Sequence, residues 1–259
     1  MIYDFHSHAL FGIDDGAKDI EMSKKMLFTS KEMGVDCVLL TPHLHPYSQK
    51  DVDEFIEKRD NLYDELSKES SLPKLIKACE LQLTCDLTKF SRLDELCINN
   101  TKYLLLEMPY TPWSDRTIEN AYRLTLKGYI PIIAHDERNV SQNPELRNAL
   151  YDLNVLIQIN ASSFLPSQHK RGLKRASVVT APYKHEIERM MRFGLVHVIG
   201  TDMHNMTTRK PCMDEALKRI QQCYGRECVD YLMNNAERIL AGETLSYRDF
   251  KSFKRKLFR

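Results

Sequence analysis

Histidines and acidic residues follow nearly every short apolar stretch of this sequence. Imidazole and carboxylate groups are the side chains that build multinuclear sites for divalent metals. Ligands gathered from the ends of many strands predict such a site at the mouth of a barrel. Glu80 and Glu107 could instead be surface carboxylates, but both end apolar stretches, where an unpaired charge is costly. The candidate ligands, in chain order, are His6, His8, Asp15, His43, Glu80, Glu107, His135, Asp202 and His204.

The two ends of the sequence carry related pairs of candidate ligands. His6 and His8 lie two residues apart, and Asp202 and His204 repeat that spacing. Side chains two apart on a strand point to the same face, so each pair can bind one ion. A single His-x-His is weak evidence, but both pairs together with the ligands between them favour a metal site.

Some candidates compete with a neighbour. His43 competes with His45, and Asp15 competes with Asp14. In each pair we expect the other residue to support the site or to be solvated. The remaining histidines lie in polar, helical or mid-strand stretches and are expected to be structural: His169, His185 and His197.

Two arginines follow candidate ligands closely. Arg138 lies three residues after His135, and Arg209 lies five residues after His204. Because a guanidinium group binds phosphate through two parallel hydrogen bonds, arginines beside a metal cluster suggest a phosphoryl substrate. The alternative is that both form ordinary salt bridges.

Segments with helical spacing separate the apolar stretches. We expect Asp51 to cap the second of them, with Glu54 in the position of a capping-box partner. Gly34, Gly128 and Gly194 stand where left-handed helix ends would lie. The expected helices span roughly 18–34, 51–69, 115–128, 144–152, 181–193 and 211–235.

A strand followed by a helix, repeated about seven times, predicts a parallel α/β sheet. In an open sheet the outer strand ends would lie well over ~20 Å apart at ~4.8 Å per strand. Ligands from seven strand ends converge only in a ring, so we expect a barrel with the metal site at the carboxyl ends of its strands. We expect one domain over 1–245 and a basic amphipathic tail over 246–259. The tail alternates Arg248, Lys251, Lys254, Arg255, Lys256 and Arg259 with Phe250, Phe253, Leu257 and Phe258.

Composition narrows the function further. The 259 residues carry 37 basic and 36 acidic side chains, so no overall field favours nucleic acid. We find no signal peptide pattern and no apolar run near the ~20 residues of a membrane span. The seven cysteines are scattered without a Cys-x-x-Cys pair, which suits reduced thiols in a cytoplasm.

The usual fingerprints of several enzyme classes are missing from the sequence. It has no phosphate-binding Gly-x-x-x-x-Gly-Lys loop, no dinucleotide Gly-x-Gly-x-x-Gly and no Gly-x-Ser-x-Gly elbow. No cysteine is followed by arginine at the interval of a cysteine-dependent phosphatase loop. We therefore expect a hydroxide activated by two or three metal ions as the nucleophile.

Several motifs together resemble the polymerase and histidinol phosphatase (PHP) superfamily. The resemblance spans residues 1 to about 240, and it is strongest to the manganese-dependent protein tyrosine phosphatases encoded with bacterial capsule and exopolysaccharide genes. The motifs are Asp4-Phe5-His6-Ser7-His8, Asp14-Asp15-Gly16, Thr41-Pro42-His43, Ile133-Ala134-His135-Asp136-Glu137-Arg138 and Thr201-Asp202-Met203-His204-Asn205.

The resemblance implies a distorted, TIM-like (β/α)7 barrel of the PHP type with up to three ions, Mn²⁺ in the first instance and Fe or Zn as alternatives. Arg138 and Arg209 would contact the phosphate. Cys79 and His45 depart from the family pattern. By motif position, His6, His8, Glu80 and Asp202 would bind one metal, Glu80 would bridge to a second held by Glu107 and His135, and Asp15, His43 and His204 would bind a third.

The expected function is hydrolysis of phosphotyrosine, on a membrane-associated bacterial tyrosine autokinase that controls polysaccharide export. A metal or a protonated group near Asp202 and His204 would assist the leaving oxygen. Alternatives are a phosphatase of histidinol phosphate or another small molecule, and a non-catalytic metal-binding scaffold. An amidohydrolase-like enzyme is disfavoured, because Glu107 and Asn160 stand where lysine and histidine are wanted. The basic tail could touch a membrane surface weakly, and the oligomeric state is left open.

Overall fold

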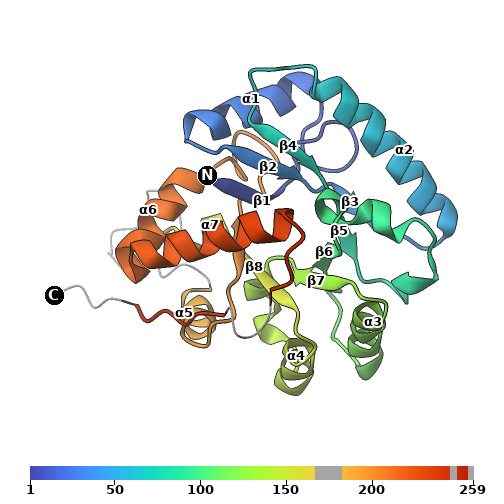
Figure 1. Cartoon of the computed structure of the whole chain (residues 1–259), viewed down its shortest axis with the longest axis vertical. Helices are drawn as coiled ribbons and strands as arrows, with labels where there is room; N and C mark the ends of the chain where they lie inside the picture. Colours follow the sequence, from blue (N-terminus) through green and yellow to red (C-terminus); the bar gives the residue numbers. More distant parts are fainter. Residues whose placement is uncertain (167–182, 246–249, 256–259) are drawn as a thin grey trace, which may run out of the picture.

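The computed structural model describes residues 1–166, 183–245 and 250–255 (Figure 1). Its strands are β1 (Tyr3–Ser7), β2 (Cys37–Leu40), β3 (His43–Leu44), β4 (Lys74–Lys77), β5 (Glu80–Gln82), β6 (Tyr103–Glu107), β7 (Ile130–Ile133), β8 (Leu156–Asn160) and β9 (Val198–Gly200). Its helices are α1 (Ile20–Glu32), α2 (Gln49–Leu66), α3 (Asp115–Leu126), α4 (Pro144–Tyr151), α5 (Lys184–Arg192), α6 (Met213–Tyr224) and α7 (Arg226–Leu240). Short 3-10 segments are η1 (Leu87–Lys89), η2 (Leu93–Leu96), η3 (Ile98–Asn100), η4 (Asp136–Ser141) and η5 (Ala161–Phe164).

The strands form a closed, distorted ring of parallel pairs. β1 pairs with β2 and β2 with β4, while the order β3, β5, β6, β7, β8, β9 continues the sheet. β2 and β3 are two pieces of one strand, as are β4 and β5, because the Glu80 N–H still donates to the Pro42 carbonyl at 3.0 Å across the breaks. The ring closes where Ser7 bridges Met203 and the Asp202 N–H donates to the His6 carbonyl. The predicted seven-stranded α/β barrel is confirmed.

The barrel interior explains why ligands come at strand ends. One of the two apolar clusters of the core takes every second residue of the strands, such as Leu105 of β6 and Val198 of β9. Polar residues continue this alternation toward the carboxyl ends: Glu107 lies two residues after Leu105, and Asp202 lies four residues after Val198, beyond Gly200. Each strand therefore fills the interior with apolar side chains first and delivers a polar one at its carboxyl end.

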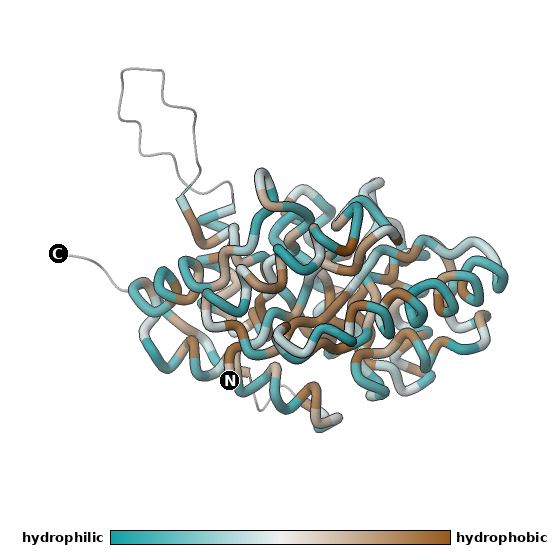
Figure 2. The backbone as a smooth tube through the Cα atoms, turned by 90° about the horizontal axis from the view of Figure 1, so that it is seen from above, coloured by the Kyte–Doolittle hydropathy of each residue, from teal (hydrophilic) through white to brown (hydrophobic). Residues whose placement is uncertain are grey.

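The other end of the barrel is closed by α7, which lies across the strands in Figure 1. Ala236 and Ile239 of this helix belong to the interior apolar cluster together with Phe5. Figure 2 shows hydrophobic residues concentrated in the middle of the molecule and hydrophilic residues along its rim. The amino-terminal ends of the strands are thus plugged, which leaves the carboxyl ends as the open mouth.

The expected helices are found, with two corrections. The segment predicted as one helix over 211–235 is two, α6 and α7, because Gly225 between them has φ 100°. The second helix begins earlier than expected: Ser48 is its N-cap, and Asp51 is the partner that completes the capping box. Residues 181–182 of the fifth predicted helix lie outside the described residues.

The predicted left-handed helix ends are present. Gly34, Gly128 and Gly194 have φ values of 87°, 83° and 71°. Such conformations cost little for glycine and more for any other residue, so these positions stop the helices and return the chain to the sheet.

Only 250–255 of the predicted tail is described. This part has no regular secondary structure. The Phe253 ring packs on Tyr231 with centroids 5.4 Å apart, and Phe250 meets His197 at 4.1 Å. The apolar side chains of this stretch thus lie against the domain, while its boundary at 245 and its membrane contact stay predictions. None of the described helices is long and apolar enough to cross a membrane.

Candidate metal centre

Four imidazoles surround the buried carboxylate of Glu80 at the barrel mouth. Glu80 Oε2 lies 3.1 Å from His6 Nε2, 3.2 Å from His8 Nε2 and 3.0 Å from His43 Nδ1, while Oε1 lies 2.8 Å from His135 Nε2. The residues come from β1, β3, β5 and the end of β7. A carboxylate with ligands on both oxygens is the arrangement that a bridging ligand needs.

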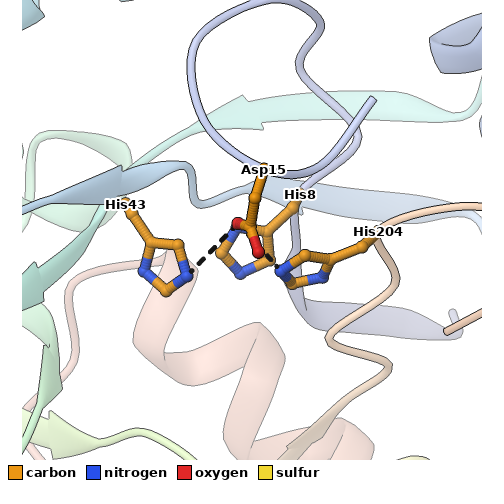
Figure 3. A group of neighbouring side chains, drawn as sticks. All are labelled: His8, Asp15, His43 and His204. Atoms are coloured by element: carbon orange, nitrogen blue, oxygen red, sulfur yellow. Dashed lines mark ion pairs between the residues drawn. The ribbon is translucent and has the colours of Figure 1, made fainter. Parts of the chain in front are cut away.

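A second group lies on the exposed side of the first. Figure 3 shows His43 and His204 with a ring nitrogen each turned toward the carboxylate of Asp15, and His8 beside them. Asp15 Oδ1 lies 3.4 Å from His204 Nε2 and 3.7 Å from His43 Nε2. One ligand atom from each of these four residues falls within 4.8 Å of the others. The Asp15 side chain is 68% exposed, so this group faces the solvent.

All nine predicted ligands take part in such groups. Besides the set around Asp15, the structure brings together His6, His8 and Asp202, and separately Glu80, Glu107 and His135. His45 joins a further group with His43 and Glu107, its Nε2 lying 3.5 Å from Glu107 Oε2. These groups differ from the three expected sets in two ways: Glu80 groups with Glu107 and His135 and not with His6, His8 and Asp202, and His8 also belongs to the group around Asp15. The assignment of ligands to individual ions stays a prediction.

Asp14 and Cys79 have different positions from the ligands. The Asp14 carboxylate binds His8 Nδ1 at 2.6 Å and accepts the His43 N–H at 3.0 Å. It therefore holds two candidate ligands and supports the site. The Cys79 thiol donates to the Leu96 carbonyl in the larger apolar cluster, on the face away from the barrel interior.

The buried carboxylates of the centre need nearby positive charge to stay ionised. Burial alone would raise the pKa of Glu80, but His6 and the other imidazoles lower it well below its ordinary value. Burial opposes the charged form of His8, yet hydrogen bonds to Asp14, Asp202 and Glu80 raise its pKa well above the usual range. Protons on the imidazoles thus balance buried carboxylates, a task that cations perform equally.

Two imidazole nitrogens at the mouth lie near carboxylates but make no hydrogen bond to any described residue. His43 Nδ1 is close to Glu80 but poorly aligned, and neither it nor His204 Nε2 makes a hydrogen bond although both are buried. Burial, followed by the charge on His8, lowers the pKa of His204 to about 4. Burial also lowers the pKa of His43. Neutral imidazoles with free lone pairs are the form that binds metal, so the residues present fit a cluster of divalent ions.

Unusual backbone conformations aim several ligands. β1 carries an irregularity between Asp4 and Ser7. His135 has φ 34° and Asp202 has φ 54°, a left-handed region that costs a non-glycine residue about 1–2 kcal/mol. Strain of this kind gathers at functional sites. A Cβ on Gly200 would lie 2.4 Å from His6 Cβ, so only glycine lets the first and last strands approach here.

Gln158 in the middle of β8 was missed by the sequence analysis. Its Oε1 accepts from the His135 N–H at 2.8 Å and binds His6 Nδ1 at 3.0 Å. Its Nε2 donates to Asn160, whose own amide donates to Asp202 Oδ2 at 2.7 Å. A polar residue inside an otherwise apolar stretch was the available signal. This chain of amides orients ligands on three strands.

Asp4 was quoted only as part of a motif, but it braces the same region. Its carboxylate accepts from the Thr201 N–H at 2.7 Å and from the Thr201 hydroxyl at 2.5 Å. Burial raises the pKa of Asp4 to about 6. The contact ties β1 to the segment that carries Asp202.

Both predicted phosphate-binding arginines meet at Asp202. Arg138 Nη2 lies 2.7 Å from Asp202 Oδ2, and Arg209 Nη2 lies 2.6 Å from Oδ1. They line a cavity of about 420 Å³ together with Asn160 and Lys210. Both arginines thus form salt bridges, which was the alternative to phosphate binding. These salt bridges also hold the two guanidinium groups side by side at the rim of the centre.

The other histidines lie apart from the centre. His197 is buried; its Nδ1 accepts from the Ile157 N–H at 2.9 Å, and burial lowers its pKa to about 3. His185 is exposed on α5. His169 lies outside the described residues.

Known proteins share this sequence and fold. The family model described as capsular polysaccharide synthesis, CpsB/CapC, matches residues 2–241. Tyrosine-protein phosphatase YwqE of Bacillus subtilis is 31% identical over 98% of both chains. Tyrosine-protein phosphatase CpsB of Streptococcus agalactiae is 31% identical over 92% of this chain and 97% of its own.

A solved structure agrees with these relatives. It belongs to the study of YwqE from Bacillus subtilis and CpsB from Streptococcus pneumoniae, described as metal-dependent tyrosine phosphatases. It superposes with a TM-score of 0.77 at 27% identity, covering 99% of this chain and 100% of that one. An archaeal ribonuclease P structure, with a TM-score of 0.53 and 14% identity, shares the fold alone. The chain belongs to the CpsB/CapC family of capsular polysaccharide synthesis proteins.

Proposed function

We propose that the chain is a metal-dependent protein tyrosine phosphatase. The observation that carries this proposal is the Glu80 carboxylate enclosed by four imidazoles, next to two arginines at the rim. The relatives named tyrosine-protein phosphatase, which match this chain over most of its length, support phosphotyrosine as the substrate.

The metal sites follow the three groups of side chains. His6, His8, Glu80 and Asp202 would hold one ion, Glu80, Glu107 and His135 a second, and Asp15, His43 and His204 a third. When bound, the ions supply positive charge beside the phosphoryl oxygens and lower the pKa of water at the centre. We propose Mn²⁺ as the native metal, which suits a site of carboxylates and imidazoles.

Arg138 and Arg209 would orient the phosphoryl group. Each uses one nitrogen on Asp202, and within the described residues neither guanidinium makes another side-chain hydrogen bond. The remaining N–H groups can bind equatorial phosphoryl oxygens and stabilise the charge that develops there. Lys210, at the same cavity, adds positive charge.

The physiological substrate we propose is a phosphotyrosine protein, such as a membrane-associated tyrosine kinase of the capsule system. The family's link to capsular polysaccharide synthesis supports this choice. A cytoplasmic location is part of the proposal and is supported by the seven cysteines, all free in the structure.

The test compares a phosphotyrosine peptide with histidinol phosphate on manganese-loaded protein. We expect the peptide to be hydrolysed far more efficiently and the activity to disappear in Glu80→Gln. Glu145→Gln, on the outer helix α4, is the matched control and should be fully active. Preference for histidinol phosphate would instead make the chain a small-molecule phosphatase, and full activity in Glu80→Gln would remove the proposed centre.

A further inference from the structure

A second cavity lies next to the candidate ligand Glu107 and shares no lining residue with the cavity of the two arginines. It measures about 430 Å³, and Tyr47, Gln82, Tyr110 and Arg116 are among its lining residues. It reaches the candidate ligand Glu107, because Gln82 Nε2 donates to Glu107 Oε2 at 3.2 Å and the Tyr110 hydroxyl donates to Oε1. A substrate bound at the centre would therefore extend into this cavity or pass directly beside it.

The walls of the cavity are fixed by buried contacts. The loop after β6 is held by Trp113, which is 6% exposed and donates its indole N–H to the Pro109 carbonyl at 3.1 Å. Gln142 binds the Trp113 N–H at 2.9 Å and the Thr111 carbonyl at 3.2 Å. Thr84, which also lines the cavity, donates its hydroxyl to the Pro46 carbonyl at 2.8 Å. A cavity with such walls is formed before a ligand arrives, which lowers the cost of binding.

The lining combines aromatic surface with one isolated cation. Tyr47 and Tyr110 are 75% and 70% exposed, unusual for large aromatic side chains. Among the described residues that line the cavity, Arg116 is the only charged one, and no ion pair joins it to another of them or to the rest of the described chain. The neighbouring Glu119, which could have neutralised it, pairs with Arg123 instead. Exposed tyrosines beside an unpaired arginine are typical of surfaces that bind polypeptides.

We propose that this cavity is a subsite for the substrate polypeptide next to the phosphotyrosine, and that it selects an acidic side chain there. The proposal rests on the proposed function. The tyrosine rings contact the peptide, and Arg116 forms an ion pair with the carboxylate. None of the described residues that line the cavity has a carboxylate, and the adjoining Glu107 carboxylate accepts hydrogen bonds from Gln82 and Tyr110.

The test uses two phosphotyrosine peptides that differ only in a flanking residue, glutamate or glutamine. The wild type should show a lower KM for the glutamate peptide than for the glutamine peptide. The KM of the glutamine peptide divided by that of the glutamate peptide should fall about 3- to 10-fold in Arg116→Ala. Arg116→Lys should restore part of the ratio. Lys127→Ala, an exposed cation just past the same helix, is the control and should leave the ratio unchanged.

A second variant tests the aromatic wall. Tyr47→Ala should raise the KM of both peptides relative to that of a small aryl phosphate. Tyr122 is an exposed tyrosine on α3 outside the cavity, and Tyr122→Ala should not change this relation. Equal KM values for both peptides, with no change in Arg116→Ala, would overturn the subsite while phosphotyrosine hydrolysis itself persists. If the wild type hydrolyses neither peptide, the proposed function and the subsite fail together.

Discussion

Replacing Gln158 by leucine should weaken metal binding without removing any ligand. The amide oxygen of Gln158 must accept, since it receives the His135 N–H, and it therefore takes the Nδ1 proton of His6. That contact leaves His6 Nε2 directed at Glu80 with its lone pair available. Leucine has a similar volume but cannot accept, so the ring of His6 loses the contact that sets its tautomer.

The expected magnitudes follow from the contacts that disappear. Leucine leaves three buried groups without partners: His6 Nδ1, the His135 N–H and Asn160 Oδ1. An orphaned buried group costs about 1–3 kcal/mol, so the free energy of unfolding should fall by about 3 kcal/mol or more. Loss of the group that orients a metal-binding histidine typically lowers metal affinity about 10- to 100-fold.

The assay separates these two effects. Manganese affinity is measured by calorimetric titration, and the free energy of unfolding by urea titration in chelator. Asn235→Leu is the control, because its buried amide donates to the His197 carbonyl at 3.0 Å, away from the centre. It should lose stability and keep its metal affinity. A folded Gln158→Leu protein that binds manganese as tightly as the wild type would refute the reasoning.

Four further predictions concern the thiols, acid stability, strand approach and phosphate binding. Chelation should abolish phosphatase activity and iodoacetamide should not, because six of the seven free cysteines are buried. Burial lowers the pKa of His197 from 6.5 to about 3, so the unfolded chain takes up this proton first and stability falls as pH drops below 6.5. In urea titrations with chelator, His197→Gln should therefore lose about 2 kcal/mol less than the wild type between pH 7 and pH 5. Gly200→Ala should shift His6, lower manganese affinity and destabilise the fold by more than the ~1 kcal/mol expected for Gly128→Ala, where open space surrounds the new methyl group. Arg209→Ala should lower kcat/KM for peptide and aryl phosphate alike, by an amount that corresponds to about 2–4 kcal/mol of transition-state stabilisation. A variant as active as the wild type would show that Arg209 does not bind the phosphate.

The sequence predicted the position of a side chain correctly where strand alternation alone decides which face of the sheet it lies on. In β6, Leu105 faces the interior, and alternation alone places Glu107 on the same side at the mouth. Asp202 keeps the spacing of Val198, but it lies beyond the end of β9 and its left-handed backbone could not be predicted from alternation. Apolar stretches and the glycines after the helices were sufficient to predict the ring of strands, because burial and backbone freedom act locally.

Local departures from that period could not be predicted. Alternation from Phe5, which packs in the interior cluster, would turn His6 away from it, and the irregularity in β1 reverses this. His135 follows Ala134, another interior residue, and enters the site only through its left-handed backbone. Both distortions depend on contacts with distant strands, such as the His135 N–H bond to Gln158, which no local pattern contains.

The closure of β9 onto β1 has a consequence for synthesis on the ribosome. Ser7 and Met203 are neighbours in space but are separated by nearly two hundred residues of translation. Until the second of them leaves the exit tunnel, β1 has one free edge and its histidines lack their partners on the last strand. Contacts of such long sequence separation form late and slowly. A chain that ends before Asp202 carries seven of the nine candidate ligands but lacks this residue and His204. The complete centre, and with it the enzyme's activity, should therefore form only when synthesis is nearly finished.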